Sequence, residues 1–234
     1  MSLIPTPSSN SDNRIHNGLC SSDSNPRLTS NHRSGKGDDG YSQLMNGIRI
    51  PKNHEACNFY GAVEELQQAI SECLFYNSDN IYSSDTVYVL KWLFRNLFSL
   101  SSFVFLKADT SRHQFPDSFL SYIESQCSLL SSQIGSAPDF LSYTHISLLH
   151  FNKIRIAVRK LESCYVAWRR SDEMVRHQLS HPELINVIAY HSAILNRLSS
   201  YLFWITRKQS QFLSSQGLSL EEQYWQSEIE SFNI

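Results

Sequence analysis

The chain has 234 residues and a mass of 26.9 kDa, which suits one ordinary domain or a domain with a tail. Hydrophobic residues make up 41% and charged residues 18%, too apolar a composition for a wholly disordered protein. The net charge of −2 argues against a strongly basic polyanion-binding domain, and five cysteines without paired spacing argue against a secreted disulfide scaffold. Because no signal-peptide pattern is visible near the N-terminus, we expect an intracellular protein, nuclear or cytoplasmic.

The composition changes near residue 54. All thirteen phenylalanines and all four tryptophans lie at or beyond Phe59, whereas five of the eight glycines lie before Lys52. Residues 1–53 are rich in Ser, Asn, Asp and Gly, and burial cannot offset a backbone-ordering cost of about 1–2 kcal/mol per residue. We therefore predict a disordered tail over residues 1–53 and a helical domain over residues 54–234.

A short amphipathic patch, Leu-Met-Asn-Gly-Ile-Arg-Ile, occupies residues 44–50 near the end of this tail. One interpretation is a linker that docks onto the folded domain. The other is a peptide that binds a partner.

Beyond Gly61 the chain has two glycines and three prolines, and this scarcity of turn residues favours helices over sheets. Apolar spacing, capping residues and the remaining breakers predict helices over about 54–75, 84–107, 116–134, 139–170 and 182–213, and a short last helix after a capping box at 219–222. The predicted fold class is all-α, an irregular bundle of about five or six helices preceded by a disordered N-terminal tail.

Residues 87–106 form the most apolar stretch, with nearly the length of a bilayer crossing. Lys91, Arg95 and Asn96 belong to a narrow polar stripe along that helix. A charge at the bilayer centre costs about 2.5–3.5 kcal/mol, so two charges within about one turn oppose insertion. We predict a central bundle helix and no membrane span.

Histidine and cysteine spacing gives no convincing metal site. His177 and His181 are four residues apart, but Pro182 disfavours helical geometry at His181. HExxH and CxxC are both absent. An alternative that spacing leaves open is a site assembled from distant ligands such as His145, His150 and Cys164.

His191 lies in the helix predicted over 182–213, in register with Leu184, Leu198 and Ile205 at seven-residue spacing. An aliphatic residue is expected there. We predict a core histidine that is hydrogen-bonded to a neighbour, and the alternative is a pH-sensitive contact or a ligand.

Motifs for catalysis are absent. The chain has no GxSxG, GxxxxGK[ST] or GxGxxG pattern. The nearest approach to a phosphate-binding motif is Gly-Lys-Gly-Asp-Asp-Gly at residues 35–40, inside the predicted tail and without a predicted strand before it. We therefore expect no enzyme and no cofactor.

Charge is unevenly distributed. Residues 55–85 hold six acidic and no basic residues, whereas residues 153–176 hold seven basic residues. The structural interpretation is that the acidic and basic helices face one another or water. The functional interpretation is a basic surface for an acidic partner.

We predict from these observations a non-enzymatic helical interaction protein, a scaffold, subunit or adaptor of an intracellular multiprotein complex. Its partners would be other protein subunits or a second copy in a homodimer. The alternative is a nucleic-acid- or chromatin-associated helical module that uses the basic stretch 153–176, and an enzyme with scattered ligands is a third hypothesis. The candidate partner-binding residues are Arg155, Arg159, Arg169, Arg170, Tyr201, Trp204 and Trp225.

Overall fold

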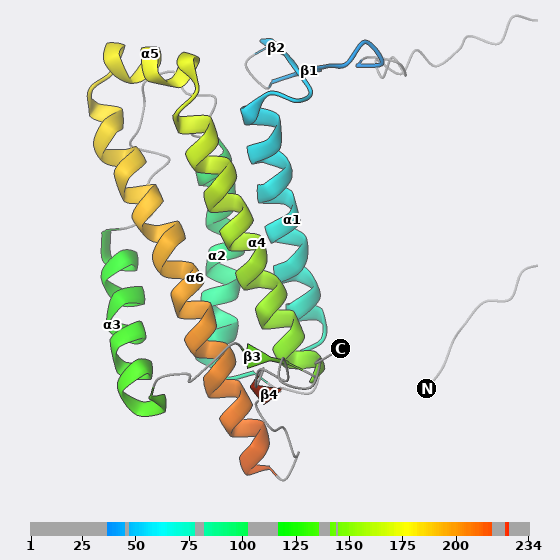
Figure 1. The fold of residues 1–234 in the computed structure, drawn as a ribbon, viewed down its shortest axis with the longest axis vertical. Coiled ribbons are helices and arrows are strands. Elements are labelled where there is room, and N and C mark those ends of the chain that lie inside the picture. Colours follow the sequence, from blue (N-terminus) through cyan, green and yellow to red (C-terminus); the bar gives the residue numbers. More distant parts are fainter. Residues whose placement is uncertain are drawn as a thin grey trace, which may run out of the picture. The chain divides into compact units, whose positions relative to one another are not determined.

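The computed structural model describes residues 37–44, 47–77, 82–102, 117–135, 141–143, 145–216 and 223–224, all within a compact unit that begins at Gly37. The elements in chain order are β1 (Tyr41–Gln43), β2 (Arg49–Pro51), α1 (Glu55–Phe75), α2 (Ser84–Ser102), α3 (Asp117–Ile134), β3 (Leu141–Ser142), α4 (Ile146–Arg169), α5 (Asp172–Ser180), α6 (Glu183–Ser215) and β4 (Gln223–Tyr224). Figure 1 shows the long helices side by side. The all-α prediction is confirmed.

Helix α4 is the centre of the bundle, because it packs against both α1 and α6, while α2 packs on α1 and α3 on α6. Ion pairs join Lys153 to Glu72 and Lys160 to Glu65, so α4 runs antiparallel to α1. The acidic and basic helices therefore face one another over part of their length. Apolar side chains from α1, α2, α4 and α6 form one continuous core.

The helix predicted over 84–107 is described as α2 up to Ser102. Its Leu90, Leu93 and Leu97 are buried, whereas Lys91 is exposed. None of the helices that the structure describes combines the length and hydropathy needed to cross a bilayer.

Strands β1 and β2 form an antiparallel hairpin in which Tyr41 lies opposite Pro51 and Gln43 lies opposite Arg49. Ile50 at its centre is buried in the core, which agrees with the docking interpretation of residues 44–50. Composition had placed these residues in a disordered tail, but strand pairing and the burial of Ile50 order residues 37–44 and 47–53. Residues 1–36 of the predicted tail lie outside the described residues.

A second pair of short strands lies where parts of two helices were predicted. Leu141 and Ser142 of β3 pair with Tyr224 and Gln223 of β4. The helix predicted from residue 139 therefore begins at Ile146, and the described residues after the capping box are extended. Hydrogen bonds between strands so far apart in the sequence produce no pattern in the local amino-acid sequence.

Helix α5 was not predicted as a separate element. Its N-cap, Ser171, accepts a hydrogen bond from the backbone N–H of Met174, whose side chain is buried. Figure 1 places α5 at the end of the bundle where the hairpin and the N-terminus of α1 lie.

Candidate functional site

His191 lies inside the bundle and has no exposed surface. Its Nδ1 is 3.3 Å from the hydroxyl oxygen of Tyr165 on α4. Tyr165 also contacts the rings of Phe59 and Trp168. The prediction of a buried, hydrogen-bonded core histidine is confirmed, and His191 belongs to the core rather than to a ligand-facing surface.

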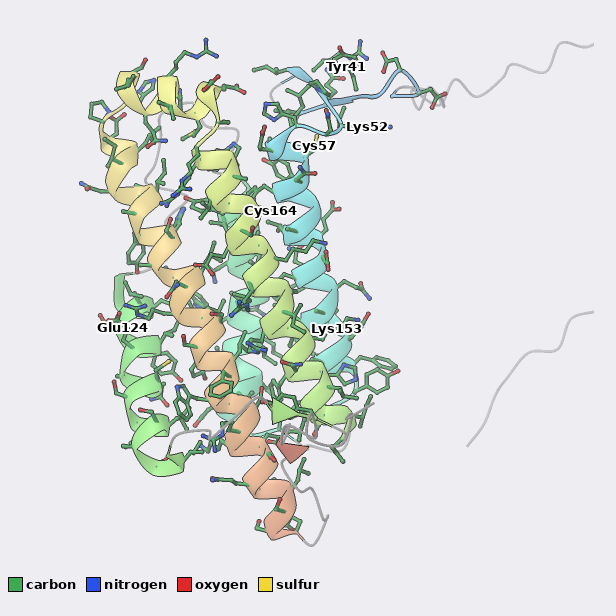
Figure 2. The ribbon with its side chains drawn as sticks, in the orientation of Figure 1. Tyr41, Lys52, Cys57, Glu124, Lys153 and Cys164 are labelled. Atoms are coloured by element: carbon green, nitrogen blue, oxygen red, sulfur yellow. The ribbon has the colours of Figure 1, made fainter. Side chains whose placement is uncertain are left out.

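A tight turn precedes the hairpin and contains two glycines with positive φ, Gly37 at 105° and Gly40 at 81°. The Gly40 N–H donates to the carbonyl of Gly37, and the carbonyl of Gly40 accepts from the Lys52 N–H at 2.8 Å. A Cβ at Gly37 would lie 2.9 Å from the Tyr41 carbonyl oxygen and 3.4 Å from Lys52 Nζ. The Lys52 ammonium therefore lies beside the turn, at the end of the molecule where Figure 2 labels Tyr41 and Lys52.

The charges around this glycine turn (residues 37–40) leave a cation available. Arg49 forms an ion pair with Asp39, and its hydrogen bond holds the pKa of that carboxyl below its ordinary value, with help from the Tyr41 N–H. Lys52 is exposed and forms no ion pair with a described carboxylate. A lysine ammonium beside a glycine turn suits phosphate oxygens.

Arg155 and Arg159 lie one turn apart on α4. Arg155 is half-buried and donates from Nε to the Asn152 side-chain oxygen at 3.0 Å, whereas Arg159 is exposed. Burial lowers the pKa of Arg155, and the charge of Arg159 lowers it further. Neither arginine has an ion-pair partner among the described carboxylates. Adjacent cations of this kind are suited to bind an anion with several oxygens.

The other predicted partner-binding residues are not gathered with this arginine pair. Arg169 donates to the Ser192 hydroxyl, and Arg170 is exposed at the end of α4. Tyr201 is buried, and Trp204 packs partly against the core. Trp225 lies outside the described residues.

An aromatic pocket of about 350 Å³ lies between α2 and α3. The rings of Trp92 and Phe119 stack there with centroids 3.9 Å apart. Sequence patterns did not indicate this pocket, because its two walls come from helices joined by a long segment. Its lining residues are Asp85, Tyr88, Val89, Trp92, Ser118, Phe119 and Tyr122.

No group of three metal-ligating side chains occurs in the part of the chain that the structure describes. The rings of His177 and His181 are 4.7 Å apart, and His181 contacts Glu183. His145 instead caps α4, because its Nδ1 accepts from the Ser147 N–H.

The glycine turn and the arginine pair are separated in one copy of the chain. Lys160 pairs with Glu65, so the adjacent Arg159 lies level with the middle of α1. Glu55 and Glu65 are ten residues apart along that helix, which corresponds to about 15 Å at the α-helical rise. The turn precedes the N-terminus of α1, so these two cationic features do not meet within one copy.

Solved structures share this fold. Two are variants of the PduO-type ATP:corrinoid adenosyltransferase from Lactobacillus reuteri complexed with cobalamin and ATP, with phenylalanine changed to alanine or to histidine. Their TM-scores are 0.60 and 0.61 at 17% identity, covering 81% and 82% of this chain and 96% and 94% of theirs. A third, an arginine-to-lysine variant of a PduO-type ATP:co(I)rrinoid adenosyltransferase from the same organism complexed with ATP, has a TM-score of 0.58 at 18% identity. That alignment covers 81% of this chain and 97% of the other. At this identity the likeness shows the fold.

The cobalamin adenosyltransferase family matches residues 33–209 of the chain, well over half its length. The chain belongs to this family. No curated protein sequence matches it significantly.

Family membership corrects the functional prediction. A non-enzymatic adaptor, and the scaffold and nuclear roles predicted with it, conflict with a family of adenosyltransferases. The prediction failed because the absence of common catalytic motifs was taken as the absence of catalysis. The glycine-rich sequence at 35–40 was discounted as a phosphate-binding motif because it lay inside the predicted tail with no predicted strand before it.

Proposed function

We propose that this chain is an ATP:corrinoid adenosyltransferase, which moves the adenosyl group of ATP to a reduced co(I)rrinoid. The observation that carries the proposal is the family match over residues 33–209. That range includes the glycine turn, the aromatic pocket and the arginine pair.

The proposed reaction is a nucleophilic displacement at the 5′ carbon of ATP. The cobalt of the reduced corrinoid substrate supplies an electron pair, and a cobalt–carbon bond forms. The bond between C5′ and its phosphate oxygen breaks, so triphosphate leaves with the bonding electrons. Charge accumulates on the leaving oxygen, and fixed cations stabilise that transition state.

Lys52 and the glycine turn are the first candidates to hold the triphosphate. The ammonium lies beside Gly37, and the two positive-φ glycines let a ligand approach the backbone closely. Arg155 and Arg159 are the second candidates, because guanidinium groups hold phosphate oxygens in fixed geometry. Two of the predicted partner-binding residues, Arg155 and Arg159, are thus proposed to bind ATP rather than a protein partner.

The aromatic pocket is the proposed contact for the corrinoid. Its stacked Trp92 and Phe119 rings offer an apolar surface, but its volume of about 350 Å³ is too small to enclose a corrin macrocycle. We propose that an apolar edge of the corrinoid packs against these rings.

The separation of the two cationic features supports the predicted homodimer, or a larger homo-oligomer. A site between two copies would bring Lys52 of one copy to the arginine pair of another. Mixing the weakly active Lys52→Ala and Arg159→Ala chains would then restore part of the lost activity, because some mixed sites would have both cations.

The central test measures formation of the alkylated corrinoid by absorbance, using full-length chain, ATP and chemically reduced cobalamin. We expect Lys52→Ala and Arg159→Ala each to lower kcat/KM about 10- to 100-fold, the size expected for a lost charge-assisted hydrogen bond of about 1.5–3 kcal/mol. Their thermal stability should be unchanged.

Lys91→Ala and Arg95→Ala are matched controls, because both side chains are exposed on α2 and neither forms an ion pair with a described carboxylate. Both should keep wild-type activity. Failure of the wild-type chain to alkylate the corrinoid would contradict the proposed function.

A further inference from the structure

His54 joins three parts of the molecule. It is the N-cap of α1, where its Nδ1 accepts a hydrogen bond from the Ala56 N–H at 3.1 Å. Its Nε2 lies 3.5 Å from a carboxylate oxygen of Glu173 on α5 and 4.0 Å from one of Glu55. Its backbone N–H donates to the Pro51 carbonyl at the end of the hairpin. One side chain therefore connects α1 and α5 where the hairpin ends.

These contacts require one protonation state of the imidazole. An Nδ1 that accepts from a backbone N–H carries no proton, so the neutral ring has its proton on Nε2. Nε2 lies 3.5 Å from a carboxylate oxygen of Glu173, so the ring and that carboxylate are in electrostatic contact. The helix cap at Nδ1 and the carboxylate contact at Nε2 are therefore compatible in the neutral tautomer with the proton on Nε2. The Glu173 carboxylate favours that tautomer and that orientation of the ring.

The same short segment carries Lys52. Its backbone N–H is bound to the carbonyl of Gly40, and two residues later His54 is bound to the carbonyl of Pro51. The path of the chain at Lys52 is thus held on one side by the glycine turn and on the other by His54. Helix α5 is itself anchored, because Met174 is buried and Gln178 donates to the Arg169 carbonyl.

We propose that His54 is a positioning residue for the nucleotide site. Glu173 orients its ring, the ring fixes the first turn of α1, and this arrangement keeps Lys52 beside the glycine turn for the triphosphate of ATP. The inference rests on the proposed function and adds α5 to the parts of the chain that serve it.

His145 provides an internal comparison. It caps α4 in the same way, with its Nδ1 accepting from the Ser147 N–H at 3.3 Å. No described carboxylate lies within ion-pair distance of it, and it belongs to a different segment from Lys52. A role limited to helix capping would make His54 and His145 equivalent.

The test uses the full chain and measures kcat, KM for ATP, KM for the corrinoid and the melting temperature. The variants are Glu173→Ala, His54→Asn, the double variant and His145→Asn. Asparagine is a good N-cap, so both histidine variants retain a capping side chain. The asparagine side chain in His54→Asn is too short to retain the contact with Glu173.

We expect Glu173→Ala and His54→Asn each to raise KM for ATP about threefold. This ratio corresponds to the free energy of one exposed contact with a charged group. The double variant should be no worse than either single one, because both remove the same interaction. KM for the corrinoid should not change, and His145→Asn should leave KM for ATP at its wild-type value.

Wild-type KM for ATP in Glu173→Ala, or additive effects in the double variant, would overturn the positioning role while the enzyme stays active. A fall in melting temperature with equal changes in every kinetic constant would also overturn it, because that outcome indicates general destabilisation. Absence of ATP-dependent turnover in the wild-type chain would overturn the proposed function and this inference together.

Discussion

The interior of the bundle and the end that carries the glycine turn treat polar groups in opposite ways. In the interior, Tyr165 and His191 are buried and pair with each other among aromatic rings. At the glycine turn, Asp38 and Lys52 are exposed, and the backbone is bent by glycines that take positive φ. In the interior these two side chains bond to each other, whereas the turn keeps a cation free of described carboxylates.

Under the proposed function, stability and ligand binding belong to separate parts of the molecule. Substitutions in the interior should lower the free energy of unfolding, because buried contacts are lost without replacement by water. Substitutions of the exposed charged side chains at the glycine turn should weaken ligand binding and leave unfolding nearly unchanged. Three substitutions would break or sharpen this contrast.

The largest effect is expected for Phe59→Ala in α1. Phe59 has no exposed surface and contacts the rings of Tyr165 and Trp168. Removing the ring should leave a cavity and lower the free energy of unfolding by about 3–5 kcal/mol. Urea unfolding followed by circular dichroism measures this change. A loss below about 1 kcal/mol would contradict the assigned core.

A smaller effect is expected for Tyr165→Phe, which removes the hydroxyl and keeps the ring. The His191 Nδ1 would lose its contact with the Tyr165 hydroxyl, and the free energy of unfolding should fall by about 1–2 kcal/mol. The same unfolding measurement applies, with Tyr88→Phe on the exposed face of α2 as the matched control. Equal stability of the two variants would show that the hydroxyl contributes nothing in the interior.

The smallest effect on stability is expected for Asp39→Asn in the glycine turn. Arg49 holds the pKa of Asp39 below its ordinary value of 3.8, so the folded state favours the charged carboxylate. This contribution is present above about pH 3.8 and is lost as the pH falls through the folded-state pKa. Because both side chains are largely exposed, the melting temperature at neutral pH should stay within about one degree of wild type.

Nuclear magnetic resonance can follow the same residue locally. The Tyr41 amide, which donates to Asp39, should shift with pH in the acidic range in the wild-type chain and not in Asp39→Asn. A large loss of global stability in Asp39→Asn would contradict the contrast, because it would show that the turn contributes to stability as the interior does.

The five long helices of the described chain were predictable because their signal is local. Apolar residues such as Phe59, Leu66 and Ile70 recur at helical spacing, and Gly135 ends α3 with a positive φ as expected for a residue after a helix. His191 was also predictable as a buried histidine, because it interrupts a regular apolar seam. These patterns depend only on neighbours within a few turns.

The candidate site was not predictable in the same way, because its parts become neighbours only when distant segments fold together. Lys52 meets Gly37 through the hairpin, Trp92 meets Phe119 across two helices, and His54 meets Glu173 on α5. Periodicity describes which face of a helix is apolar. Packing in three dimensions sets which charged and aromatic groups come within reach of one ligand.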